Sequence, residues 1–177
     1  VDVSFSSLAA TTGLVVGAGD IRLDLSSQSY DIQQTLVVGP FEGDTAQLSL
    51  DLGSGGGDLT LPSLDVGSWG RVSLSDNHNP QITEVWLDPW GIVVGGAGLT
   101  GGLTSQGGRL LPGMANGDPA EFVIFGEYSQ WAAGSPESPG WSGALELDIA
   151  GPQAGVDHDR LLVTGIAELS GMLRLDF

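Results

Sequence analysis

Cysteine and lysine are both absent from this 177-residue sequence, and no apolar run approaches the length of a membrane span. Without cysteine, neither a disulfide framework nor a thiolate site for zinc or an iron–sulfur cluster can form. A transmembrane helix needs about 18 or more consecutive apolar residues, so we predict no membrane span. The fold must therefore be held by packing and by backbone hydrogen bonds.

Positive charge is also scarce, since five arginines face 22 acidic residues and the formal net charge is −17. Such a surface repels the phosphates of nucleic acids and of anionic lipids, so we expect neither as a partner. Cations suit it as counter-ions, and calcium is the one that we consider as a bound ion. A solvated acidic surface explains the same charge without any cofactor, and it is the simpler interpretation.

Signals for long amphipathic helices are missing, whereas glycine occurs 29 times and proline nine times. This composition indicates frequent turns. Segments such as 48–52, 145–149 and 173–177 alternate apolar and polar residues, which is the pattern of a strand with one buried face. With 41% hydrophobic residues, the chain can build a core, and its length fits a single domain over residues 1–177.

Short aliphatic strands that stop at a glycine recur along the chain. Five such strands end at Gly17, Gly39, Gly67, Gly95 and Gly165. The first three intervals fall within the roughly 20 to 50 residues that are typical of stacked structural repeats. We therefore predict an all-β, right-handed parallel β-solenoid with glycine corners and short turns. An antiparallel β-sandwich, which also has many short strands, is the alternative.

The repeat also predicts which side chains share the core. The apolar pairs that precede three of these glycines hold the same place in the repeat, so we expect them to lie in aligned columns. The pairs are Leu36 with Val38, Leu64 with Val66, and Ile92 with Val94.

Four segments in the second half of the chain carry a resemblance. They are a glycine–proline turn at 108–113, a strand at 125–130, an alternating strand at 143–151 and a closing coil at 158–175. Together they resemble the passenger-like β-helix repeats of bacterial autotransporters and related secreted, surface-anchored proteins. The resemblance implies a parallel β-helix that is extracellular or on the cell surface, after removal of an export signal. Against the family pattern, residues of about 112–142 look like a loop-rich insertion.

Two tryptophans are candidates for stacking on sugar rings. Trp86 and Trp90 bracket residues 87–89, and Trp86 alternates with Val85 and Leu87, as an outward-facing residue would. Buried tryptophans that fill the corners of the coil are the simpler reading. A surface glycan is therefore the alternative partner, and a glycan-binding module is the alternative function.

Asp157 and Asp159, on either side of His158, are the weak candidates for a metal site, which would hold calcium. An aspartate in such a turn more often caps its own backbone, and we favour that interpretation for Asp159.

Two acidic pairs are spaced to lie on one side of a strand, as a carbohydrate-active enzyme on a β-helix scaffold would require. These pairs are Glu84 with Asp88 and Glu121 with Glu127. With 22 acidic residues such pairs arise by chance, and no catalytic set converges, so we expect no enzyme.

The two ends of the chain alternate like strands. A solenoid end with an unpaired edge invites pairing with another chain. We therefore expect a non-enzymatic extracellular structural or adhesive protein that assembles head to tail as the subunit of a filament, with an N-terminal strand (about 1–7) exchanged with a neighbour. The residues expected at this contact are Val1, Val3, Phe5, Leu173, Leu175 and Phe177.

Overall fold

The structure is a computed structural model. It describes residues 9–10, 14–24, 30–40, 42–43, 45–51, 59–74, 80–96, 98–113, 118–131, 143–153 and 156–177. Within these ranges the regular elements are all β-strands. They are β1 (Ala9–Ala10), β2 (Leu14–Val16), β3 (Gly19–Asp24), β4 (Tyr30–Ile32), β5 (Leu36–Val38), β6 (Ala46–Asp51), β7 (Leu59–Val66), β8 (Gly70–Leu74), β9 (Gln81–Leu87), β10 (Ile92–Gly95), β11 (Gly98–Leu99), β12 (Gly102–Ser105), β13 (Arg109–Pro112), β14 (Glu121–Ile124), β15 (Tyr128–Gln130), β16 (Ala144–Asp148), β17 (Arg160–Val163), β18 (Ala167–Leu169) and β19 (Met172–Asp176).

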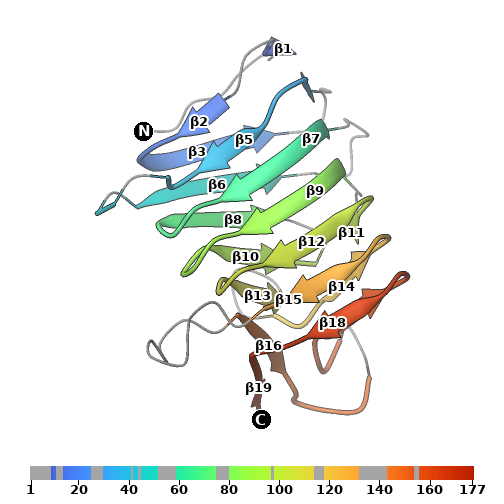
Figure 1. Ribbon diagram of the computed structural model, residues 1–177. Coiled ribbons are helices and arrows are strands. Elements are labelled where there is room, and N and C mark those ends of the chain that lie inside the picture. The colour runs from blue at the N-terminus through green and yellow to red at the C-terminus, as the bar shows by residue number, and fades with distance from the viewer. Residues whose placement is uncertain are drawn as a thin grey trace.

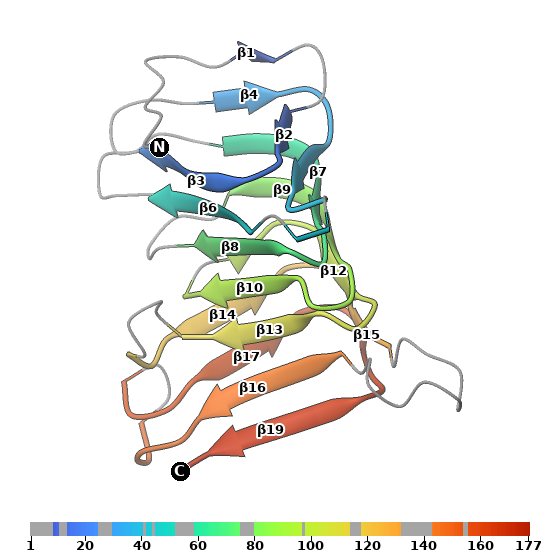
Figure 2. The same cartoon turned by 90° about the vertical axis from the view of Figure 1, so that its left-hand side faces the viewer.

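The described strands form three sheets, and every strand pairs in parallel with the equivalent strand of the next coil. The first sheet has the order β1-β4-β7-β9-β12-β15-β18, with β2 and β5 beside β7. The second has the order β3-β6-β8-β10-β13-β16-β19, and the third consists of β11, β14 and β17. Figures 1 and 2 show the coils stacked in one column, which descends in a right-handed sense from the N-terminal to the C-terminal end. The prediction of a parallel β-solenoid is confirmed, and the antiparallel sandwich is wrong.

The predicted core columns are right in the first sheet. Leu36 pairs with Leu64, and Val38 pairs with Val66. All four side chains are buried in one continuous apolar core. The next coil adds Val85 and Leu87 to these two columns.

The prediction for Ile92 and Val94 is wrong, because β10 belongs to the second sheet. Ile92 lies between Arg71 and Arg109 in that sheet and lines an outer groove. Val93 instead takes the inward place, in a column with Val72 and Leu110. Gly39 and Gly67 follow β5 and β7 of the first sheet, whereas Gly95 is the last residue of β10 in the second sheet.

One corner of the solenoid, where the first sheet turns into the second, is lined by small residues. Consecutive coils place there Gly19, Ala46, Gly70, Gly91, Gly108, Gly143 and Gly171. A Cβ atom on Gly70 would lie 2.2 Å from the carbonyl oxygen of Val38, and one on Gly91 would lie 2.5 Å from that of Val66. Stacking of the coils therefore excludes a side chain at Gly70 and at Gly91.

The column that begins with Val66 and Leu87 becomes polar toward the C-terminal end. It continues as Ser105 and Gln130, which are both buried. Gln130 accepts a hydrogen bond from the Tyr128 hydroxyl (2.8 Å) and donates to the carbonyl of Gly143 (2.8 Å) and to that of Met172 (3.1 Å). Burial raises the pKa of Tyr128, which keeps this hydroxyl protonated as a donor. These hydrogen bonds satisfy the polar atoms inside the core.

The expected loop-rich insertion at about 112–142 contains two regular strands. β14 pairs with β11 and β17, and β15 pairs with β12 and β18. The described part of this range therefore belongs to the coils, while residues 114–117 and 132–142 lie outside the described residues. The expected N-terminal strand at 1–7 lies outside them as well.

Candidate functional site

The two candidate sugar-stacking residues both lie on the outside of the solenoid, but in different places. Trp86 is 38% exposed on the outer face of β9, between the buried Val85 and Leu87, so the simpler interpretation of a buried tryptophan is wrong here and the outward alternative holds. Trp90 is 53% exposed and lies in the turn between β9 and β10. Each tryptophan lines a separate groove.

The first groove, called the corner groove below, has a volume of about 320 Å³ and runs across four coils. Its lining residues are Asp20, Thr45, Ala46, Gln47, Ser68, Trp69, Gly70, Arg71, Trp90 and Ile92. Trp69, which is 43% exposed, was not among the predicted site residues.

Trp69 and Trp90 occupy equivalent positions in neighbouring coils. Each precedes a corner glycine, and these two glycines are aligned because Arg71 pairs with Ile92. Each turn is closed by an equivalent backbone hydrogen bond. In the first turn the amide of Gly70 donates to the carbonyl of Gly67 (2.8 Å), and in the second the amide of Gly91 donates to the carbonyl of Asp88 (2.9 Å). Adjacent strands lie about 4.8 Å apart, so these two residues of neighbouring coils are close along the coil axis, and both line the corner groove.

The backbone at Trp90 is unusual. Its φ of 73° is the one positive value among the described residues other than glycine, and the aligned residue of the next coil is Gly107 (φ 105°). Such a conformation costs a bulky residue about 1 kcal/mol or more, and strain of this kind is typical of functional positions. A glycine would fit this turn at lower cost.

Polar side chains follow the corner groove along the second sheet. The register aligns Asp20 with Gln47, Gln47 with Arg71, and Arg71 with Ile92. Carboxylate, amide and guanidinium groups supply both donors and acceptors beside the two indoles. The corner groove therefore combines aromatic faces with convergent polar groups, as small-ligand sites do.

The second groove, called the sheet groove below, has a volume of about 270 Å³ and lies on the outer face of the first sheet. Trp86 donates its indole N–H to Glu84 (3.3 Å). Glu84 pairs with Gly102, and Glu127 precedes Tyr128, which pairs with Leu103. Glu84 and Glu127 therefore flank a residue that has no side chain.

Two of the acidic residues considered from their spacing have other charged neighbours in the structure. Glu121 instead forms an ion pair with Arg160 of β17 (3.0 Å). Asp88 lies near Asp65, and partial burial, with a smaller effect from the Asp65 charge, raises the pKa of Asp88. The combination of Glu84 with Glu127 could be found only once the coil lengths were known.

Asp159 is buried and acts as a clamp between chain segments. Its carboxylate accepts hydrogen bonds from the backbone N–H of Ala120 (3.1 Å) and of Asp148 (2.9 Å). Burial raises the pKa of Asp159, and these two hydrogen bonds oppose the rise. This geometry supports the favoured interpretation, in which Asp159 caps backbone.

Asp157 is also bonded to its own loop, because it accepts a hydrogen bond from the backbone N–H of Gln153 (3.1 Å). The ring nitrogen Nδ1 of His158 lies 3.0 Å from the carbonyl of Gly151. Within the described residues, no group of three or more histidine or acidic side chains is arranged to hold a metal ion. The calcium site at Asp157 and Asp159 stays a prediction.

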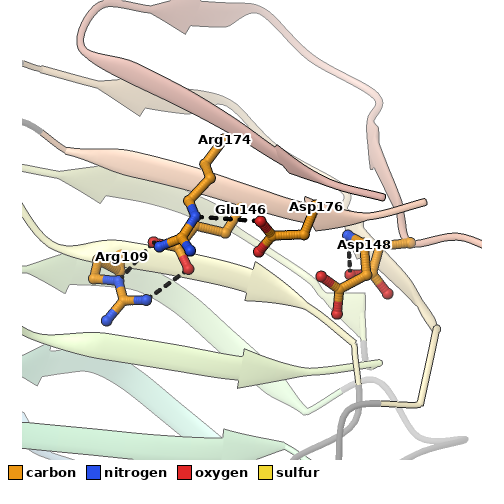
Figure 3. A network of polar contacts seen from close by, with 6 residues as sticks. Arg109, Glu146, Asp148, Arg174 and Asp176 are labelled. Carbon is orange, nitrogen blue, oxygen red and sulfur yellow. Dashed lines mark hydrogen bonds and ion pairs between the residues drawn. The ribbon is translucent and has the colours of Figure 1, made fainter. Parts of the chain in front are cut away.

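A network of ion pairs covers the outer face of the second sheet near its C-terminal end (Figure 3). Arg109 donates to both oxygens of Glu146, at 2.9 and 2.6 Å. Arg174 lies 4.0 Å from Glu146 and 3.5 Å from Asp176. Arg109 and Arg174 are thus neutralised by carboxylates of their own or of a neighbouring coil.

The C-terminal residues predicted for self-assembly are exposed. Leu173 and Leu175 belong to β19, at the edge of the second sheet, and Phe177 is 93% exposed. Their predicted partners Val1, Val3 and Phe5 lie outside the described residues.

No protein-family model matches this chain, and no curated protein or solved structure was found to be similar to it. The fold and its surface therefore define the class, which is a parallel β-solenoid with two tryptophan-lined grooves on its outside. No helix able to span a membrane is present in the part of the chain that the structure describes. The resemblance to autotransporter passenger repeats stays a prediction.

Proposed function

We propose that this chain is a non-enzymatic, extracellular structural protein with an adhesive role, and that it binds carbohydrate in the corner groove. One observation carries the proposal: Trp69 and Trp90 stand at equivalent positions of neighbouring coils, each about half exposed, beside Asp20, Gln47 and Arg71. The apolar face of a sugar ring can stack on an indole, while its hydroxyl groups bond to the polar side chains.

Binding rather than cleavage suits the composition of this groove. Most glycoside hydrolases use two carboxylates on opposite sides of the scissile bond. The residues that line the corner groove include one carboxylate, that of Asp20. The sheet groove does hold two, Glu84 and Glu127, with Trp86 beside them, and it is the place where the enzymatic alternative would be tested.

Trp69→Ala and Trp90→Ala are each expected to weaken carbohydrate binding by about tenfold or more, because stacking on an aromatic ring contributes on the order of 1–2 kcal/mol. Affinity electrophoresis against neutral and acidic polysaccharides measures this loss. Trp131→Ala is the matched control, since Trp131 is 51% exposed and lines neither groove. Equal retardation of all three variants and the parent protein would refute carbohydrate binding at this corner, and release of reducing ends would refute the non-enzymatic role.

A separate observation favours a second function, which is assembly of copies end to end. The last coil, formed by β17, β18 and β19, exposes large apolar side chains over its end face. They include Ile166, Leu169, Met172, Leu173, Leu175 and Phe177. We propose that the segment containing Val1, Val3 and Phe5 of a second copy pairs with this edge as an added strand, which gives a head-to-tail contact that can repeat.

Leu173→Glu is expected to keep the protein folded and to shift it from polymers to single copies, since a charge would be buried at the contact. Deletion of residues 1–6 should have the same effect, because it removes the segment that pairs with the C-terminal edge of the next copy. Sedimentation velocity measures the size distribution. Phe125→Glu is the control, because Phe125 is also exposed but lies at a corner within the stack. Polymers that survive both Leu173→Glu and the deletion would contradict this assembly.

A further inference from the structure

Arg71 differs from Arg109, Arg160 and Arg174 in its contacts. Arg109, Arg160 and Arg174 each contact a carboxylate of a neighbouring coil or strand. The side chain of Arg71 forms no ion pair or side-chain hydrogen bond with any other described residue, although the chain has 22 acidic residues. Its guanidinium is therefore available to a ligand, and Arg71 lies in the corner groove with Trp69 and Trp90.

The neighbours of Arg71 in the sheet do not neutralise it. Gln47 precedes it and Ile92 follows it in the column of outward residues, and neither carries a charge. Asp20 lies two coils away, which corresponds to about 9–10 Å between backbones. This spacing leaves room for an anionic group beside Arg71 and for hydroxyl groups beside Gln47 and Asp20.

We propose that the corner groove selects a sugar that carries a carboxylate, such as a uronic acid residue in an acidic polysaccharide. This inference rests on the carbohydrate function proposed above and names the ligand class of the same groove. The guanidinium of Arg71 pairs with the sugar carboxylate through two parallel hydrogen bonds, for which its planar fork is suited. The ring of the same sugar stacks on Trp69 or Trp90.

The large negative charge of the chain does not prevent this contact. At physiological ionic strength, charges separated by more than about 8 Å are largely screened, whereas a bidentate pair forms at hydrogen-bond distance. Added salt therefore weakens the distant repulsion together with the local attraction. A nonspecific electrostatic effect, in which any loss of positive charge lowers the affinity for an anionic sugar, is distinguished from the specific pair by comparing Arg71→Gln with Arg160→Gln.

Isothermal titration calorimetry on the full chain tests the inference with an oligogalacturonate and its carboxyl-reduced neutral form, at one ionic strength. The parent protein should bind the acidic form at least tenfold more tightly. Arg71→Gln should remove this preference, so that the acidic form binds no more tightly than the neutral form. Arg160→Gln, which removes the same charge outside the groove, should leave the preference intact.

Three outcomes would overturn the inference: equal binding of both forms by the parent protein, equal losses in Arg71→Gln and Arg160→Gln, or tight binding of a sulfated oligosaccharide without binding of the oligogalacturonate. If the parent protein binds both forms equally and Trp90→Ala weakens the binding of both, the carbohydrate function stands and the carboxylate preference fails. If Trp69→Ala and Trp90→Ala leave the binding of every sugar unchanged, the carbohydrate function itself fails.

Discussion

Replacing Val66 by aspartate is expected to unfold the domain. Val66 is buried between Val38 and Leu87 in a core column of the first sheet. A carboxylate at this position would be buried without a partner, which costs several kcal/mol and is comparable to the 5–15 kcal/mol of total stability of a typical domain. Circular dichroism with thermal melting should show the loss of the cooperative transition.

Val15→Asp is the matched control for this substitution. Val15 lies in β2 of the same sheet, one position from the buried Val16, and faces outward with 51% of its surface exposed. An exposed carboxylate there should change the stability by no more than about 0.5 kcal/mol. Equal melting of Val66→Asp and the parent protein would mean that the core columns are wrongly assigned.

Most of the fold could be predicted because its local signals agree with one another. Alternation of apolar and polar residues marked strands such as 48–52, and a glycine after Val38 and after Val66 marked the same corner in two coils. The prediction failed at Gly95. The same local pattern, three aliphatic residues and a glycine, forms β10 there, which belongs to the second sheet. The local sequence at a corner glycine does not distinguish one corner of the coil from another. Because the coils also differ in length, the number of residues between glycines does not determine which residues are aligned.

The candidate site was predicted only in part, for a related reason. The outward position of Trp86 followed from its place between Val85 and Leu87, which is a local property of a strand. The partnership of Trp69 with Trp90 depends on which residues of successive coils are aligned. A signal was present, since both tryptophans directly precede a glycine, Gly70 and Gly91, but recognising it required the alignment of the corner column.

That Arg71 has no side-chain partner among the residues that the structure describes could not be predicted at all. Arg71 and Arg109 lie in the same outward column of the second sheet, on either side of Ile92. They differ because β16 brings Glu146 within 2.6 Å of Arg109, while Arg71 has the neutral Gln47 and Ile92 as its neighbours. Ion pairing in a solenoid is thus decided by the residues of adjacent coils, which are distant in the sequence.

The adjacent residues Gly101 and Gly102 are expected to respond very differently to the addition of one methyl group. A Cβ atom on Gly101 would lie 1.8 Å from the carbonyl oxygen of Thr83, whereas the nearest atom to a Cβ on Gly102 is the carbonyl oxygen of Glu127 at 3.2 Å. Gly101→Ala must push backbone of one coil away from the next, so we expect it to lower the free energy of unfolding by about 2–3 kcal/mol.

Gly102→Ala needs a shift of only a few tenths of an ångström, so its effect should stay below about 1 kcal/mol. Because neither glycine has a left-handed backbone, the difference between the two variants measures the space between coils and not a conformational preference of glycine. Urea denaturation followed by circular dichroism provides both midpoints. Each coil rests directly on the backbone of the one before it at this corner, so the methyl group of Gly101→Ala has no flexible side chain to displace. Coincident midpoints for Gly101→Ala and Gly102→Ala would show that the coils are not in backbone contact there.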